Sequence, residues 1–212
     1  MGDAAQVYAD VRLWERTRYK AEGGGVSGFY AHWHKEMPES IEATADDSVM
    51  AVIRFEGGAM GQWTQSYAAH GQGFGHRVLY GSQGSLLPGG IRNGRSPVLT
   101  LDGGQTITGD ALLELVPDLY LDEITARLFG AERLSAYELP FPAADRKLLA
   151  IEYHELGRCA LTGASPEVDG QAGRRALALC YAAFESSALN RPVTLDEVEA
   201  EQVGAYEADV NA

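Results

Sequence analysis

Basic residues are few in this sequence. Lysine and arginine together number 17 among 212 residues, against 30 aspartates and glutamates, and the formal net charge is −13 at pH 7. Phosphate backbones and anionic lipid surfaces attract basic patches and repel an acidic chain. We therefore expect no nucleic acid and no membrane as partners, whereas a neutral small molecule such as a sugar is compatible with this charge.

Cysteine and long apolar runs are also scarce. The two cysteines, Cys159 and Cys180, both fall within helical patterns. They are typical of small buried apolar residues and not of a disulfide or a metal-binding pair. The longest apolar runs reach about the length of a strand, so neither a membrane span nor a signal peptide is predicted. We expect a cytoplasmic protein.

The sequence motifs of the common nucleotide and hydrolase sites are missing as well. There is no Walker-type sequence and no G-x-S-x-G elbow. The segment Gly71–His76 reads G-x-G-x-G, whereas the dinucleotide fingerprint is G-x-G-x-x-G and opens a helix. We interpret it as a glycine-rich connection between strands, and we predict no cofactor site in this chain.

The patterns that are present predict a single domain over residues 1–212. Its length and its 45% hydrophobic content are sufficient for a substantial core. Strands are indicated by alternating or continuous apolar residues, and the glycine pairs Gly57-Gly58 and Gly103-Gly104 mark hairpin turns. The predicted strands are Ala4–Glu15, Val49–Phe55, Ala59–Tyr67, Arg77–Gly81, Pro97–Leu101 and Gln105–Thr108. We expect Val49–Phe55, Ala59–Tyr67 and Arg77–Gly81 to be adjacent antiparallel strands.

Helical patterns dominate the second half of the chain. Gly163 and Pro166 are expected to end one helix, and Asp169 is expected to cap the next. The predicted helices are Leu119–Phe129, Ala143–Thr162, Gly170–Leu189 and a final short helix, Leu195–Tyr206. The predicted fold class is therefore α+β, with a large, mainly antiparallel sheet and helices packed on one face.

The other face of this sheet is predicted to mediate oligomerisation. The strand Val49–Phe55 carries apolar side chains on both sides, with Met50 and Val52 opposite to Val49, Ala51 and Ile53. Leaving such a face open would expose a larger apolar patch than a monomer usually tolerates. We therefore expect a homo-oligomer that buries it.

Residues 16–42 are predicted to form a long loop, and such loops are often functional. The loop contains the cluster His32-Trp33-His34. In an extended segment His32 and His34 would share a face, as half of a metal site or as a polar wall for a hydroxylated substrate. The cluster is equally compatible with an aromatic loop that packs on the sheet or on a neighbouring subunit. His70 and His76 flank the glycine-rich turn, where either could reach a cleft or have a purely structural role.

Four stretches carry a resemblance to a known family. They are an acidic pair, Asp46-Asp47, before an apolar strand, then RFEGGAMG at Arg54–Gly61 and YGSQGSL at Tyr80–Leu86. A fourth is the closing segment Gly163–Val198. In order and spacing they resemble the C-terminal domain of the Gfo/Idh/MocA family of NAD(P)-dependent oxidoreductases.

The resemblance implies an enzyme that acts on a sugar, cyclitol or related polyol. It also implies an N-terminal Rossmann domain with a glycine fingerprint, a catalytic Lys and a helix carrying an Asp and a His. We find no counterpart of these in the sequence, and Met1–Val7 resembles the family's exit from that helix. We therefore expect no catalytic residue here, with NAD or NADP held by the complete enzyme.

Two other readings stay open. The chain is also compatible with a stand-alone module that binds carbohydrate or assembles subunits without catalysis. It is further compatible with a fragment or split-gene product whose Rossmann polypeptide is separate. The substrate-binding residues favoured by the sequence are His32, Trp33, His34, His70 and His76.

Overall fold

The computed structural model describes residues 1–20, 31–71, 75–90 and 92–210, without the side chains of residues 31, 32, 209 and 210. These residues form two compact units, Met1–Gly73 with Glu167–Ala212 (unit 1) and Phe74–Pro166 (unit 2). The α+β class with mainly antiparallel sheets is confirmed. That the chain acts as one domain stays a prediction.

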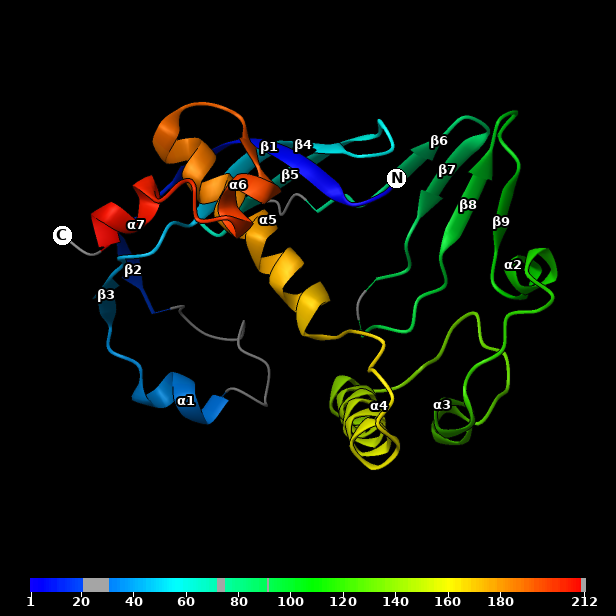
Figure 1. Ribbon diagram of the computed structural model, residues 1–212. Helices are drawn as coiled ribbons and strands as arrows, with labels where there is room; N and C mark the ends of the chain where they lie inside the picture. The colour runs from blue at the N-terminus through cyan, green and yellow to red at the C-terminus, as the bar shows by residue number, and fades with distance from the viewer. Residues whose placement is uncertain (21–30, 72–74, 91, 211–212) are drawn as a thin grey trace. The chain divides into compact units, whose positions relative to one another are not determined.

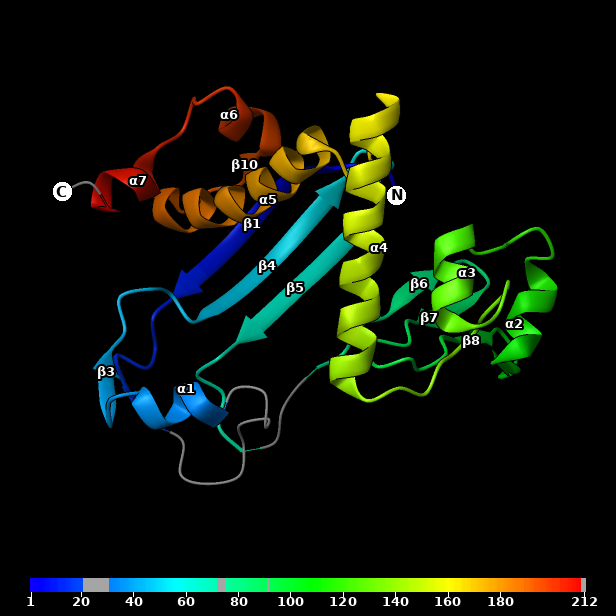
Figure 2. The ribbon, with the colours of Figure 1, turned by 90° about the horizontal axis from the view of Figure 1, so that it is seen from below.

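Unit 1 is built on a four-stranded sheet in the order β10-β1-β4-β5. β1 pairs antiparallel with β4, and β4 pairs antiparallel with β5. Figure 1 and Figure 2 both show the long helix α5 lying along β1. The elements of this layer are β1 (Ala4–Arg12), β4 (Ser48–Phe55), β5 (Met60–Ser66), β10 (Val193–Thr194) and α5 (Gly170–Leu189). Two short helices follow it, α6 (Leu195–Glu199) and α7 (Ala205–Val210).

The core of unit 1 lies between this sheet and α5. Successive strand residues point to opposite faces, so alternate residues of β1 and β4 meet the helix. The helix contributes alanines, whose small side chains let its backbone approach the sheet closely. The buried apolar residues are Val7, Ala9, Ala51, Ile53, Ala178, Ala182, Ala183, Val193 and Leu195. The helix predicted over Gly170–Leu189 is thereby confirmed.

The opposite face of the same sheet is open within unit 1. Tyr8, Met50, Val52 and Met60 point to this side, and Met50 and Met60 are 63% and 72% exposed. The charged side chains Asp10, Arg12 and Arg54 are also on this face. This face therefore carries apolar side chains, as the sequence predicted, with polar and charged residues such as Asp10 and Gln62 among them.

The hairpin between β4 and β5 is confirmed, although its turn has three residues and not two. The Phe55 N–H donates to the Ala59 carbonyl at 3.0 Å, which leaves Glu56, Gly57 and Gly58 in the connection. Gly58 has a φ of 83°, the positive value expected at the end of such a loop. Gly57 is needed for space, because a Cβ there would lie 2.6 Å from the Met1 carbonyl oxygen.

Unit 2 contains a second antiparallel sheet, in the order β6-β7-β8-β9. Its strands are β6 (Leu79–Gly81), β7 (Gly84–Leu87), β8 (Val98–Leu101) and β9 (Thr106–Thr108). The helices of this unit are α2 (Asp110–Leu115), α3 (Glu123–Phe129) and α4 (Phe141–Thr162). The predicted hairpin around Gly103-Gly104 and the predicted helix 143–162 are confirmed. The predicted helix Leu119–Phe129 begins only at Glu123, where Asp122 caps it.

The prediction that Arg77–Gly81 pairs with the strand 59–67 was wrong. β6 pairs with β7 through the short turn at Ser82-Gln83, and Gly84 follows with a φ of 154°. The pairing is therefore made with the nearest strand in sequence, where closing a two-residue turn costs less entropy than closing a longer loop.

The prediction of one long loop over residues 16–42 was also wrong in part. β2 (Thr17–Tyr19) and β3 (Ser40–Glu42) pair antiparallel as a two-stranded ribbon. Between them lies the short helix α1 (Ala31–Glu36). Residues 21–30 of the predicted loop lie outside the described residues.

Candidate functional site

The His32-Trp33-His34 cluster belongs to α1 and not to an extended segment. Positions two apart in a helix are separated by roughly 200° around its axis. The predicted shared face of His32 and His34 was therefore wrong. Trp33 is half-exposed, His34 is partly buried, and the His32 side chain lies outside the described residues.

His70 and His76 both have exposed side chains. His70 belongs to unit 1, where its Nε2 lies 3.3 Å from a carboxylate oxygen of Glu15. His76 belongs to unit 2. Nothing in these positions tests whether the five predicted residues contact a substrate, and their roles stay predictions.

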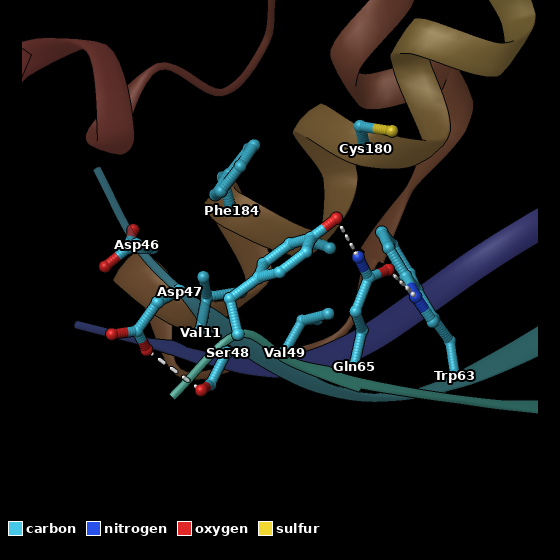
Figure 3. Close-up of a pocket in the computed structure, with 11 residues that line it drawn as sticks. Val11, Asp46, Asp47, Ser48, Val49, Trp63, Gln65, Cys180 and Phe184 are labelled. Carbon is cyan, nitrogen blue, oxygen red and sulfur yellow. Dashed lines mark hydrogen bonds between the residues drawn. The ribbon is translucent and has the colours of Figure 1, made fainter. Parts of the chain in front are cut away.

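Unit 1 contains a pocket on the helix-covered side of its sheet (Figure 3). Its volume is about 180 Å³. The ends of β1, β4 and β5 contribute Val11, Val49, Trp63 and Gln65, and α5 contributes Cys180, Ala183 and Phe184 from the opposite side. Asp46, Asp47, Ser48 and Tyr67 complete the lining. The pocket therefore joins three stretches that are far apart in the sequence.

A row of hydrogen-bonded side chains forms the β5 wall of this pocket. The Trp63 indole N–H donates to the Gln65 amide oxygen at 3.4 Å, and the Gln65 amide nitrogen donates to the Tyr67 hydroxyl at 2.7 Å. Figure 3 shows Trp63 and Gln65 side by side above the strand. Trp63 and Gln65 are two apart on β5, and Tyr67 lies one residue beyond its end, so their alternation places them on the face that α5 covers. The wall offers both aromatic surface and hydrogen-bonding groups.

Asp47 fixes the end of the pocket where β1 leaves the sheet. Its carboxylate accepts hydrogen bonds from the Trp14 and Glu15 N–H groups, from the Ser48 hydroxyl and from the Arg18 guanidinium. Burial alone would raise the pKa of Asp47, but these donors outweigh it and the pKa is lowered. These bonds also end β1 at Arg12, short of the predicted Glu15.

Asp46, next to it, is exposed and accepts no hydrogen bond from any described residue. Its negative charge acts on Tyr206, whose pKa is raised mainly by burial and then by Asp46. Tyr206 stacks on Phe184 with 4.5 Å between the ring centroids. The buried carboxylate of Glu185 holds this region by accepting hydrogen bonds from the Ala205 and Tyr206 N–H groups.

Among the described residues, no group of three or more His, Cys, Asp or Glu side chains is placed to hold a metal ion. The carboxylate of Asp47 is occupied by its donors, one of which is the Ser48 hydroxyl. Within the described part of the chain, none of the helices has the length and apolarity that crossing a bilayer requires.

The residues of this pocket were missed at the level of sequence. The alternation Trp63-x-Gln65-x-Tyr67 was a usable signal, because it places three amphipathic side chains on one face of a strand. Asp46-Asp47 was noticed only as part of the resemblance. The contribution of α5 has no local signal, since its pocket residues are indistinguishable from the core stripe.

Comparison with known proteins finds no matching family model and no matching curated protein. Solved structures do match. An NAD-binding oxidoreductase from Klebsiella pneumoniae aligns at 19% identity and a TM-score of 0.57, over 91% of this chain and 46% of its own. Levoglucosan dehydrogenase in complex with NADH and L-sorbose aligns at 19% identity and a TM-score of 0.53, over 92% and 46%.

A third match is an oxidoreductase from Agrobacterium radiobacter in complex with NAD⁺, L-tartaric acid and magnesium. It aligns at 17% identity and a TM-score of 0.52, over 92% of this chain and 44% of its own. The chain thus has a fold that these oxidoreductases contain, and it spans less than half of their length. The resemblance to the C-terminal domain of Gfo/Idh/MocA oxidoreductases is confirmed at the level of the fold.

Proposed function

We propose that this chain is the substrate-binding and assembly half of an NAD(P)-dependent oxidoreductase acting on a sugar, cyclitol or related polyol. The observation that carries the proposal is the alignment of 92% of this chain onto less than half of levoglucosan dehydrogenase. Fold alone does not fix function, but L-sorbose in that structure supports a hydroxylated substrate.

The cofactor is assigned to a Rossmann domain that is separate from the residues described here. NAD⁺ and NADH in the matching structures support NAD as the cofactor of the complete enzyme. A dinucleotide site needs a glycine turn that opens a helix, so that backbone N–H groups meet the pyrophosphate. The complete enzyme would draw its hydride chemistry from that domain, and this chain would wall the substrate with the 16–42 segment and the edge of the sheet.

Assembly is assigned to the open face of the unit 1 sheet. Tyr8, Met50, Val52 and Met60 place exposed apolar side chains there, and a second copy of the same face would bury them. A cytoplasmic location is part of the same proposal, and the free thiols of Cys159 and Cys180 support it.

Calorimetric titration with NAD and NADP, together with an absorbance assay over a polyol panel, tests this function. The chain alone is expected to show neither tight dinucleotide binding nor turnover. Without an oriented cofactor it loses the roughly 7–11 kcal/mol by which proximity lowers the activation barrier. Adding a separately encoded Rossmann polypeptide from the same genome neighbourhood is expected to restore turnover. Micromolar binding of NAD by the chain alone, about 8 kcal/mol, would contradict the assignment.

A further inference from the structure

We propose that the unit 1 pocket is a binding site for one neutral hydroxylated ring, and that it selects against anionic sugars. The inference rests on the proposed function in taking the ligand to be carbohydrate, and it adds the size and charge of that ligand and its location. The pocket is distinct from the histidines that the sequence singled out, since none of them is among the residues that line it.

The size of the pocket suits a single small ring. Sites for drug-sized ligands usually measure about 300–1,000 Å³, whereas this pocket measures about 180 Å³. A monosaccharide ring is of this order, and a disaccharide or a nucleotide is larger.

A sugar ring has C–H faces and a polar edge of hydroxyl groups, and the walls of the pocket offer a contact surface for each. Trp63 lines the pocket from β5 and Phe184 lines it from α5 (Figure 3), where one face of the Phe184 ring stacks on Tyr206. Aromatic rings pack well against the C–H faces of a ring that is otherwise polar. The hydroxyl groups at the edge of the ligand then need partners at the margin of the pocket.

Gln65 and Tyr67 provide such partners after their own hydrogen bonds are counted. The Gln65 amide uses one lone pair for Trp63 and one N–H for Tyr67, so one lone pair and one N–H are left. The Tyr67 hydroxyl accepts from Gln65 and keeps its own proton to donate. Donors and acceptors therefore alternate along this wall, as hydroxyl groups require.

The charge of the lining disfavours an anion. Among the described residues that line the pocket, none is Lys, Arg or His. The Asp47 carboxylate is already paired with Arg18 at 3.1 Å, while Asp46 has no such partner. A carboxylate or phosphate on the ligand would face the uncompensated charge of Asp46, while a neutral hydroxyl could donate to it.

Ligand-observed NMR with the full chain tests these points, with L-sorbose and levoglucosan as neutral probes and L-tartrate as the anionic probe. We expect a dissociation constant of about 1–10 mM for at least one neutral probe, and binding of L-tartrate at least about tenfold weaker. Gln65→Ala is expected to weaken neutral binding about tenfold. Gln62→Ala is the matched control, because Gln62 is the same residue type on the opposite face of β5 and should leave binding unchanged.

A second measurement needs no variant. Cys180 lines the pocket, and Cys159 is buried in α4. The neutral probe is expected to slow alkylation of Cys180, measured by mass spectrometry, while Cys159 serves as the internal reference. Unchanged alkylation of Cys180 at saturating probe would place the ligand elsewhere and overturn the inference.

The remaining outcomes separate this inference from the proposed function. Equal binding of L-tartrate, absence of neutral binding, or full binding by Gln65→Ala would each overturn the pocket assignment. Turnover with the Rossmann polypeptide that is insensitive to Gln65→Ala would leave the oxidoreductase role standing with its substrate site elsewhere. Binding that depends on Gln65, without any restored turnover, would retain the pocket and reject the oxidoreductase role.

Discussion

Asp46 and Asp47 are neighbours in the chain with opposite surroundings. The Asp47 side chain is 1% exposed and holds the β1 exit, the ribbon residue Arg18 and the start of β4 together. Asp46 faces solvent. Removing the same negative charge from each should therefore have very different effects on stability.

We expect Asp47→Asn to lower the free energy of unfolding by about 2–3 kcal/mol, since hydrogen bonds to a buried charged group are worth about 1.5–3 kcal/mol. Chemical denaturation measures the change. Asp46→Asn is the matched control and should stay within about 0.5 kcal/mol of the wild type. Equal effects of the two substitutions would show that the buried carboxylate is not what holds these segments.

The lowered pKa of Asp47 also predicts a pH dependence. The pKa of this carboxylate is lower in the folded chain than its ordinary value of 3.8. Its contribution to stability is therefore complete at pH values well above 3.8. This contribution is lost as the pH falls through the lower, folded pKa. The stability difference between wild type and Asp47→Asn should therefore be constant near neutrality and shrink below about pH 4.

The wild type and Asp47→Asn share all other carboxylates, so the contributions of these groups to the pH dependence of stability cancel in the difference. Glu197 is one of them, and its pKa is lowered to about 2, first by the Thr194 N–H and then by Arg191. A stability difference between the two proteins that grows on acidification would contradict the role of Asp47.

The sequence could show that two acidic residues precede β4, but it could not show which one is buried, because the partners of Asp47, Trp14, Glu15 and Arg18, come from another segment.

At the scale of elements, the edge of β1 is completed by a helix. β10 pairs only with Gln6 and Val7. Beyond that point the Ala9 N–H donates to the Ser186 hydroxyl and the Val11 N–H donates to the Ser187 hydroxyl, both at 3.0 Å. Serines of α5 thus satisfy the backbone donors that a strand would otherwise pair.

Ser186→Ala is expected to cost about 1–3 kcal/mol, because it leaves the buried Ala9 N–H without an acceptor. Ser186 also donates to the Arg191 carbonyl at 2.7 Å, and that bond is lost too. Thermal or chemical unfolding measures the effect. Ser165→Ala, at an exposed serine, should change stability by less than about 0.5 kcal/mol, and a similarly small effect at Ser186 would contradict the role given to its hydroxyl.

Elements with their own local signals could be predicted, and their partners could not. Asp169 accepts a hydrogen bond from the Ala172 N–H, and Gly163 adopts a left-handed conformation. Both ends of the connection between α4 and α5 could therefore be predicted from the sequence. β6 had an equally clear strand pattern but was paired with the wrong neighbour. A strand pattern specifies a face and a period, and it leaves open which edge completes the hydrogen bonds.

For the whole molecule, the open face of the unit 1 sheet makes the assembly testable. We expect the chain to sediment as an oligomer at tens of micromolar, by rough estimate from typical affinities. Val52→Lys should weaken association by about 100-fold or more, because a charge would enter an apolar interface. Val168→Lys, at another exposed valine, should leave it unchanged. A monodisperse wild-type monomer would contradict the assembly role.

The pocket shows what sequence analysis misses at this scale. Trp63 and Gln65 come from β5, Val11 from β1 and Phe184 from α5, so the site exists only once distant segments have packed. The histidine cluster stood out because its residues are adjacent in sequence. Adjacency makes a cluster visible, whereas a binding pocket depends on the tertiary fold.

The division of unit 1 into two stretches sets the order of events during synthesis. β1, β4 and β5 leave the ribosome early, but α5, which covers their apolar side, follows only after the whole of unit 2, Phe74–Pro166. At ~5–20 residues per second this interval lasts about 5–20 s. Unit 2 is continuous and has its own sheet, so it has time to fold first, while the nascent sheet waits uncovered for the helix that closes it.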